Sequence, residues 1–143
     1  MPPKGDRVRF DTKLAIVVRD DLQIWQKLNV TAFLAGAVAA GADGVTGEPY
    51  EDASGRKYLA MFVQPVLVFR GSAEQLTAAY TRAVAREVRL GIFTEELFAT
   101  DNDVDNRAAV AGVPSDALRL VGLALHDDRR VVDKVLKGLR LHP

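Results

Sequence analysis

KLAIVVR, residues 13–19, is an apolar run of strand length that is rich in β-branched residues. A run without polar residues at alternate positions is typical of a strand that is buried on both faces of its sheet. Such strands occur in sheets whose two faces are covered by helices. We therefore expect residues 13–19 to form a buried strand of an α/β domain.

Strand and helix patterns alternate along the rest of the chain, which is the order typical of an α/β sheet with helices on its faces. Ser72 and Gln75 form a capping box, which is typical of a helix start. Gly41 and Gly91 suit helix ends. Pro65 divides an apolar run, because proline cannot donate a hydrogen bond within a central strand. The predicted helices cover residues 29–41, 72–91 and 127–139, the predicted strands cover residues 58–71, 92–99 and 118–126, and residues 42–57 are expected to form a loop or a short hairpin.

Length and composition indicate one ordinary globular domain. The chain has 143 residues, 48% of them hydrophobic and 27% charged, with 19 basic and 19 acidic side chains. A net charge of zero argues against a partner rich in phosphates. The chain has no cysteine, no apolar run of the roughly 20 residues that span a bilayer and no signal-peptide core. We expect a cytoplasmic protein with a tail at residues 1–11 and a single domain at residues 12–143.

DNDVDN, residues 101–106, concentrates carboxylates. The alternate aspartates resemble the start of a calcium-binding loop. That loop needs glycine at its sixth position and glutamate at its twelfth, and this chain has Asn106 and Gly112 at those positions. Asx turns and the N-cap of a helix starting near Asn106 are the simpler interpretation. A looser magnesium site is the alternative. We assign no metal and no cofactor.

Two turns are predicted to meet at one edge of the sheet, because ligands in open α/β sheets bind beyond the carboxyl ends of strands. Lys27 would orient a polar or anionic substrate, and Asp21 or Asp101 would position water for attack on an ester or amide. The alternative is that these are turn residues and a solvated lysine. The expected substrate-binding residues around them are Asp20, Trp25, Asn29, Thr31, Thr100, Asn102 and Asp103. Trp25 would wall the pocket or, as tryptophans commonly do, cover the edge of the core.

Other catalytic motifs have little support. The two histidines are His126, at a strand end, and His142, and no serine lies in a G-x-S-x-G turn. No G-x-G-x-x-G or P-loop follows a strand. Arginines at residues 82, 86 and 89 form a basic stripe, which is expected to be a solvated helix face.

Three stretches resemble the type-two peptidyl-tRNA hydrolases. KLAIVVRDDL (13–22) looks like their first strand and its R-x-D-L motif, with Arg19, Asp21 and Leu22 at the matching positions. QPVLVFRGSAEQL (64–76) looks like their second strand and the helix entry after it. LVGLALHDDRRVVDKVLKGLRL (120–141) looks like their last strand and helix.

A closer resemblance is to a bacterial branch of that fold known as domain of unknown function 2000. It is carried by WQKLNVTAFL, FTEELFATDNDVDNRAAVAG and VDKVLKGLRL in this order, and the likeness covers roughly residues 12–141. It implies a three-layer α/β/α sandwich on a small mixed β-sheet, with one strand antiparallel to the others. It also implies a homodimer.

The catalytic pattern of the hydrolases is retained only in part. Asp21 and Asp101 match their aspartates, but Gln26 and Leu28 stand where they have lysines, and Lys27 falls on a glycine. The glutamine and histidine of their A-A-Q-x-x-H helix are alanines here. The added carboxylates would repel RNA phosphates, so tRNA is not the expected substrate. The alternative to a hydrolase is a non-catalytic ligand-binding or interaction module on the same fold.

Overall fold

The structure is a computed structural model, and it describes residues 8–143. Five strands form one sheet in the order β5-β6-β1-β4-β7. These strands are β1 (Thr12–Arg19), β4 (Val66–Gly71), β5 (Gly91–Thr94), β6 (Leu120–Asp128) and β7 (Arg140–Leu141). The helices are α1 (Ile24–Gly41), α2 (Ala73–Ala85), α3 (Asp103–Ala111) and α4 (Arg129–Val135), with the short 3-10 helices η1 (Glu95–Ala99) and η2 (Ser115–Ala117).

The sheet is mixed. β1 pairs in parallel with β4, whereas β6 is antiparallel to both β1 and β5, and β7 is antiparallel to β4. β1, β4 and β5 therefore run in one direction and β6 and β7 in the other. The resemblance implied one antiparallel strand. The second, β7, has only two residues, and no apolar run marks it in the sequence.

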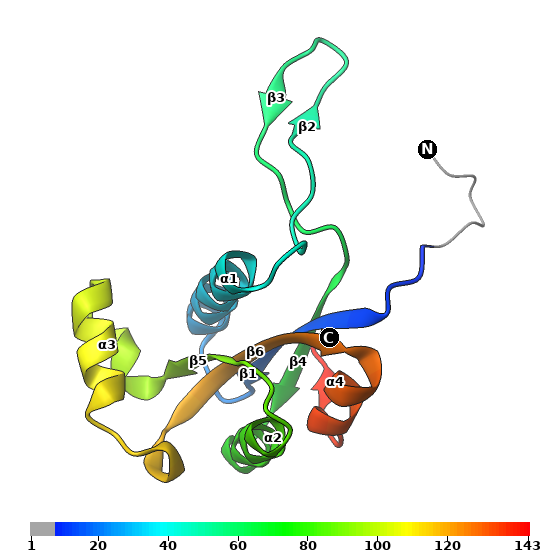
Figure 1. The fold of residues 1–143 in the computed structure, drawn as a ribbon. Coiled ribbons are helices and arrows are strands. Elements are labelled where there is room, and N and C mark those ends of the chain that lie inside the picture. The colour runs from blue at the N-terminus through cyan, green and yellow to red at the C-terminus, as the bar shows by residue number, and fades with distance from the viewer. Residues whose placement is uncertain (1–7) are drawn as a thin grey trace.

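Helices cover both faces of the sheet, with α1 on one face and α2 and α4 on the other (Figure 1). β1 lies in the middle, and its residues 14–18 are each at most 1% exposed. Leu14, Ile16 and Val18 pack in the core beneath α1, while Ala15 and Val17 pack in the core beneath α2 and α4. The expectation of a strand buried on both faces of an α/β sheet is confirmed.

α1 lies very close to the sheet. A Cβ at Gly122 of β6 would be only 2.4 Å from Val30 Cγ1 of α1, so the absence of a side chain there lets the helix approach. α1 begins at Ile24, five residues before the predicted start, because Gln26 accepts from the Gln23 amide at 2.9 Å and caps the first turn. Two expected site residues, 29 and 31, are thus half-buried within the helix rather than at its start.

Three other predicted boundaries are wrong. α2 ends at Ala85 rather than Gly91, because Glu87 takes a φ of 57° and turns the chain; Gly91 instead begins β5. The predicted strand 92–99 stops at Thr94 and continues as η1. The predicted helix 127–139 is shortened to α4, because β6 extends to Asp128.

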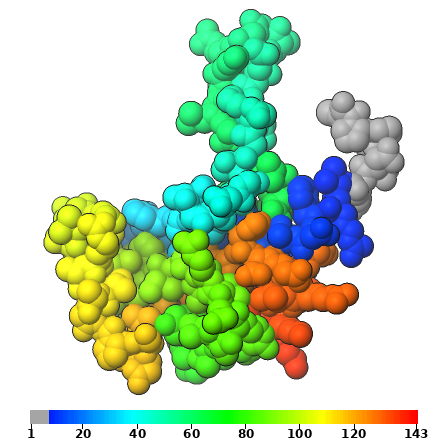
Figure 2. Space-filling model, in the orientation of Figure 1, coloured from blue at the N-terminus to red at the C-terminus, as the bar shows by residue number. Residues whose placement is uncertain are grey.

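Residues 46–62 form an arm that stands clear of the rest of the molecule (Figure 2). Its strands β2 (Tyr50–Glu51) and β3 (Lys57–Tyr58) pair antiparallel, which confirms the expected hairpin. Residues 1–7 of the expected tail lie outside the described residues. At the end of that tail, the carbonyls of Phe10 and Asp11 accept hydrogen bonds from Arg129 at 3.1 and 3.0 Å. Within residues 8–143, no helix has the length and apolar character needed to cross a membrane.

Candidate functional site

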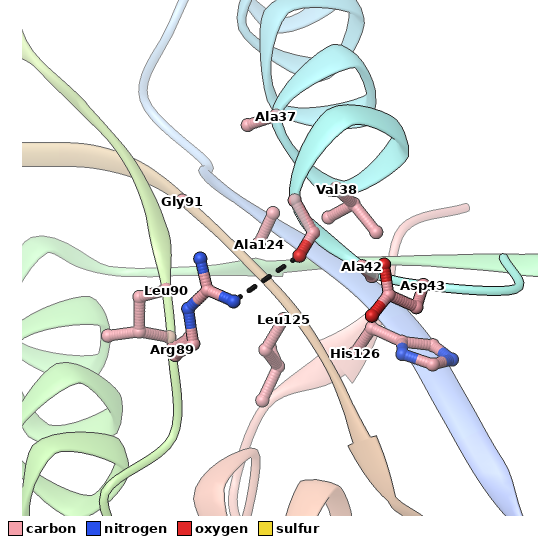
Figure 3. Close-up of a pocket in the computed structure, with 11 residues that line it drawn as sticks. Ala37, Val38, Ala42, Asp43, Arg89, Leu90, Gly91, Ala124, Leu125 and His126 are labelled. Atoms are coloured by element: carbon pink, nitrogen blue, oxygen red, sulfur yellow. Dashed lines mark hydrogen bonds between the residues drawn. The ribbon is translucent and has the colours of Figure 1, made fainter.

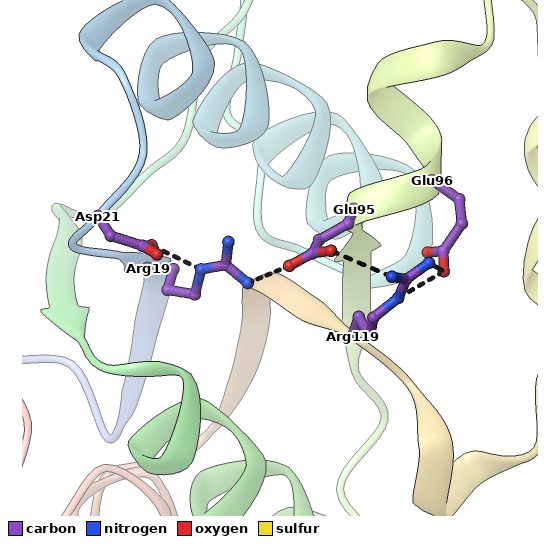
Figure 4. A network of polar contacts seen from close by, with 5 residues as sticks. All are labelled: Arg19, Asp21, Glu95, Glu96 and Arg119. Atoms are coloured by element: carbon purple, nitrogen blue, oxygen red, sulfur yellow. Dashed lines mark hydrogen bonds and ion pairs between the residues drawn. The ribbon is translucent and has the colours of Figure 1, made fainter.

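Charged side chains meet where the parallel strands β1 and β5 end. Arg19, the last residue of β1, donates from Nε to Asp21 Oδ1 at 2.6 Å and from Nη1 to Glu95 Oε1 at 2.7 Å (Figure 4). Glu95 is the first residue after β5. The turn after β1 and the segment after β5 therefore lie together, joined by an arginine between two carboxylates.

Arg119 extends this network from the start of β6. Its Nη2 and Nε donate to Glu96 Oε1 at 2.7 and 3.1 Å, and its Nη1 lies 3.6 Å from Glu95 Oε2. We call these five residues, Arg19, Asp21, Glu95, Glu96 and Arg119, the Arg19 network. Its guanidinium groups are all bonded to carboxylates of the network itself, so it connects three segments of the chain.

The pKa shifts of Arg19, Arg119 and Glu96 favour their charged forms. Burial alone would lower the pKa of Arg19, but its hydrogen bonds with Glu95 and Asp21 outweigh that effect and raise the pKa. The hydrogen bond from Arg119 lowers the pKa of Glu96. The Arg19 network is therefore an arrangement of fixed opposite charges, which is suited to structural support rather than to proton transfer near neutral pH.

The acidic stretch at residues 101–106 caps a helix. Asn102 is the N-cap of α3 and accepts from the Asp105 amide at 2.9 Å, while its Nδ2 donates to Asp101 Oδ1 and Asp105 Oδ2, both at 2.8 Å. Asp103 forms an ion pair with Arg107 one turn later. α3 starts three residues before the predicted position, but the cap chemistry is the kind that the sequence indicated.

Lys27 and Asp101 do not contact each other. Lys27 Nζ lies 3.2 Å from His142 Nε2, beyond β7. Within residues 8–143, no hydrogen bond or ion pair joins Lys27 to Asp21 or to Asp101. Hydrogen bonds and ion pairs therefore do not join the expected trio: Asp21 belongs to the Arg19 network, and Lys27 contacts the C-terminal segment.

The other expected substrate-binding residues lie around the same edge. Trp25 is 56% exposed and packs edge-on against Phe98, with 5.9 Å between ring centroids. Phe98 in turn packs against the buried Phe93, so Trp25 lies at the edge of the core. Thr100 Oγ1 donates to the Leu97 carbonyl at 3.0 Å, and the amide of the exposed Asp20 donates to the Gly71 carbonyl at 2.9 Å. These contacts organise turns.

A cavity of about 300 Å³ opens at the other end of the β1–β6 pair, between the end of α1, the start of β5 and β6 (Figure 3). Its lining combines apolar surface with the side chains of Asp43, Arg89 and His126. Asp43 and His126 are both among the labelled lining residues in the close-up. We call it the His126 cavity.

Two side chains from distant parts of the chain, those of Gln64 and Thr12, contact His126 Nε2. Gln64 is only 9% exposed, and its Nε2 donates to the Thr12 carbonyl at 3.2 Å, which turns its Oε1 toward the imidazole. That Oε1 lies 3.1 Å from His126 Nε2. Because an amide oxygen can only accept, the neutral imidazole carries its proton on Nε2. Nδ1 is then the nitrogen with a free lone pair, and it can accept a proton or a hydrogen bond.

Arg89 brings a cation to the same cavity. Its Nη1 donates to the Gly41 carbonyl at 3.4 Å, at the negative end of the α1 dipole. The guanidinium keeps further donors that this contact does not use. The predicted arginine stripe is thus not simply solvated: Arg82 also caps a helix, donating to the Val135 and Lys137 carbonyls at 3.0 and 3.1 Å.

The sequence predictions did not select the His126 cavity. Its signals are a histidine that ends the buried run LALH and a glutamine that interrupts the apolar run FVQPV. Gln64 lies 62 positions from His126 and Thr12 lies 114 positions from it. Their meeting depends on the strand order, which no local pattern shows. As for metals, no group of three or more His, Asp or Glu side chains within residues 8–143 is placed to hold an ion.

Comparisons with known proteins place the chain among uncharacterised relatives. Residues 12–143 match a family described as "Protein of unknown function (DUF2000)". No curated protein matches the chain. A similar solved structure is that of a protein of unknown function, Atu0240, from Agrobacterium tumefaciens strain C58, with 41% identity, a TM-score of 0.91, and coverage of 94% of this chain and all of that one. The family match spans nearly the whole described chain, so this protein belongs to the DUF2000 family.

Proposed function

We propose that the protein binds a small polar molecule with an anionic group in the His126 cavity. The observation that carries the proposal is the fixed imidazole: the buried Gln64 amide bonds His126 Nε2, and the imidazole lines the cavity. The Gln64 amide is itself oriented, because its Nε2 donates to the Thr12 carbonyl while its Oε1 contacts the histidine. This makes the histidine a prepared hydrogen-bond acceptor.

The lining indicates the class of ligand. Arg89 can donate two parallel hydrogen bonds to a carboxylate or phosphate, and His126 Nδ1 and Asp43 can accept from a hydroxyl or an amino group. A volume of about 300 Å³ is at the small end of ligand sites. A hydroxy or amino carboxylate, or a small phosphate ester, satisfies these groups together. This is the ligand-binding alternative that the sequence left open.

Titration of the ¹⁵N-labelled protein with small hydroxy carboxylates, amino carboxylates and inorganic phosphate tests the proposal. We expect one class to shift the ring signals of His126, and Arg89→Gln to weaken its binding at least tenfold. Arg86→Gln is the matched control, because Arg86 also donates to a helix carbonyl, that of Arg82 at 3.0 Å, but does not line the cavity. Equal affinity in both variants, or no shift at millimolar concentrations, would contradict the proposal.

A second candidate is hydrolysis of an ester or amide in a polar substrate, with Lys27 orienting the substrate and Asp21 or Asp101 positioning water. It is supported by the 3.2 Å contact between Lys27 Nζ and His142 Nε2, which places an amine beside an imidazole. In this view the domain is a three-layer α/β/α relative of the type-two peptidyl-tRNA hydrolases, and helices on both faces of a mixed sheet support that relation.

Small esters and amides and a panel of charged tRNAs separate the two candidates. Hydrolysis by the Lys27 site predicts that Lys27→Ala or Asp101→Asn abolishes turnover and leaves the melting temperature within a few degrees. Turnover that is unchanged in both variants, or absent from the wild-type protein, would exclude this site as the catalytic centre. The cavity proposal does not depend on the result.

A further inference from the structure

From residue 32 to its end, α1 is apolar on all sides but buried on only one. Residues 28–42 contain no charged side chain, whereas only Val30, Leu34 and Val38 of the helix are buried. On the side away from the sheet, Leu28 is 67% exposed and Ile24 is more exposed still. A helix that is apolar all round is normally covered all round, so the outer face of α1 lacks a partner within residues 8–143.

Most large apolar side chains of the arm next to α1 are also exposed, although Phe62 at its base packs against the core. Leu59 is 90% exposed, Met61 and Val63 are exposed too, and residues 58–69 contain no charge. A two-stranded hairpin is marginally stable by itself in water. Its tip is nevertheless well organised, because Asp52 accepts from the Ser54 and Arg56 amides and, at 2.6 Å, from the Tyr58 hydroxyl. The arm therefore presents its apolar base, residues 58–63, in a defined orientation.

These two surfaces are continuous. A groove of about 370 Å³ joins them, lined on the α1 side by Ala35, Gly36 and Ala39 and on the arm side mainly by Met61 and Phe62. The groove has almost no polar surface. The outer face of α1 and the base of the arm thus form one apolar surface with a recess beside a projection.

A second copy of this chain fits that surface in area and in shape. The large exposed residues on it are Ile24, Leu28, Tyr58, Leu59, Met61 and Val63. With about 200 Å², an aromatic-sized area, as the upper figure for each side chain, their exposed parts amount to at most roughly 800 Å², comparable to what one partner contributes to an interface of standard size. A projection next to a recess is self-complementary across a two-fold axis.

We propose that the protein forms a two-fold homodimer in which the α1 face and the arm base of each copy cover those of the other. The arm of one copy lies along the partner's α1, and the charged arm tip remains in solvent. A lipid surface and an unrelated protein are the competing occupants, and neither would produce self-association.

Sedimentation velocity tests the dimer with a pair of matched variants. Ala32→Glu places a charge on the outer face of α1, and Ala78→Glu makes the same change at an exposed alanine of α2, on the other face of the sheet. We expect the wild-type protein to sediment with twice its monomer mass of 15.6 kDa. Ala32→Glu should raise the dimer dissociation constant at least 100-fold, and Ala78→Glu should leave it within twofold.

A second pair tests the arm. Leu59→Asp should weaken the dimer at least tenfold, whereas Val104→Asp, a like change at an exposed residue of α3, should not. Circular dichroism reports that each variant is folded; both sites are exposed in the monomer, so folding should not depend on them. A wild-type protein that is monomeric at high micromolar concentration overturns the proposal. So does a dimer that both Ala32→Glu and Leu59→Asp leave intact.

Discussion

The two ends of the β1–β6 pair use charged and polar groups in opposite ways. At the Arg19 end, each guanidinium is bonded to carboxylates of the same network. At the His126 end, one ring nitrogen is fixed by Gln64, but Asp43 and Arg89 line a cavity, and Arg89 has donors beyond the one bonded to the Gly41 carbonyl. Groups that are bonded to each other stabilise and connect segments, and groups left without protein partners can bind a ligand. The paired charges of the Arg19 network therefore connect segments of the chain.

The close packing of α1 on the sheet is common to both ends, and Gly122→Val should disturb it. The new side chain would overlap Val30 Cγ1, which is 2.4 Å from the position of a Cβ, and Leu34 Cδ1, at 2.8 Å. We expect a loss of about 3 kcal/mol in the free energy of unfolding, measured by urea denaturation. Gly112→Ala is the control, because its Cβ would make ordinary contacts at 3.6 Å. Equal stability of the two variants would show that α1 can move away without cost.

Arg19→Met should have the next largest effect, because it removes the guanidinium of the Arg19 network and keeps the apolar stem. The Arg19 side chain is 15% exposed, so its pairs are intermediate between surface and buried ion pairs, and we expect a loss of about 2 kcal/mol. Arg107→Met removes an ion pair with Asp103 in which the Arg107 side chain is 70% exposed. It should lower the free energy of unfolding by less than about 0.5 kcal/mol. If the two variants lose equal stability in chemical denaturation, the network is not structural.

Gln64→Leu should act at the other end. It removes the acceptor of His126 Nε2 and the donor to the Thr12 carbonyl, and we expect a loss of about 1 kcal/mol. Its sharper effect is on the imidazole. Two-bond ¹H–¹⁵N spectra at neutral pH should show the proton on Nε2 in the wild-type protein and a mixture of tautomers in the variant. His142 serves as the internal control, and an unchanged His126 spectrum would mean that Gln64 does not set the tautomer.

The smallest expected effect is on how the stability of the fold depends on pH. The hydrogen bond from Arg119 lowers the pKa of Glu96 in the folded protein, so the unfolded chain binds that proton more tightly. The pair stabilises the fold above the ordinary glutamate pKa of about 4.3, and this contribution is lost as the pH falls through the lowered pKa.

Arg119→Gln should therefore melt slightly below the wild-type protein at pH 7, and the two melting temperatures should converge on acidification. Thermal melts from pH 7 downward measure the difference. A difference that grows toward acid would mean that Glu96 is not the group being held.

Much of the fold follows from local patterns. The β-branched run of residues 13–19 is β1, the Ser72–Gln75 capping box starts α2, and the acidic stretch caps α3. Each depends on residues within a few positions of one another. Two of the wrong boundaries have local causes that are hard to recognise in a sequence. A pair of glutamines caps α1 at an earlier start, and Glu87 ends α2 in a conformation that usually needs glycine.

The candidate sites were predicted less well, because they consist of distant residues. The parallel direction of β1 and β5 brings the end of β1 beside Glu95, but Lys27 turned toward His142, which is 115 positions away. A carboxylate after a strand is equally able to cap a helix, pair with an arginine or face a ligand. Only its neighbours in space distinguish these roles.

The sequence by itself determined the class of the fold, the buried central strand and most helix caps, since these depend on periodicity and on hydrogen bonds between near neighbours. The tertiary structure alone decided which polar groups are bonded to each other and which face a cavity. That difference arises because the strand order β5-β6-β1-β4-β7 brings residues 12, 64 and 126 together and keeps residues 27 and 101 out of contact.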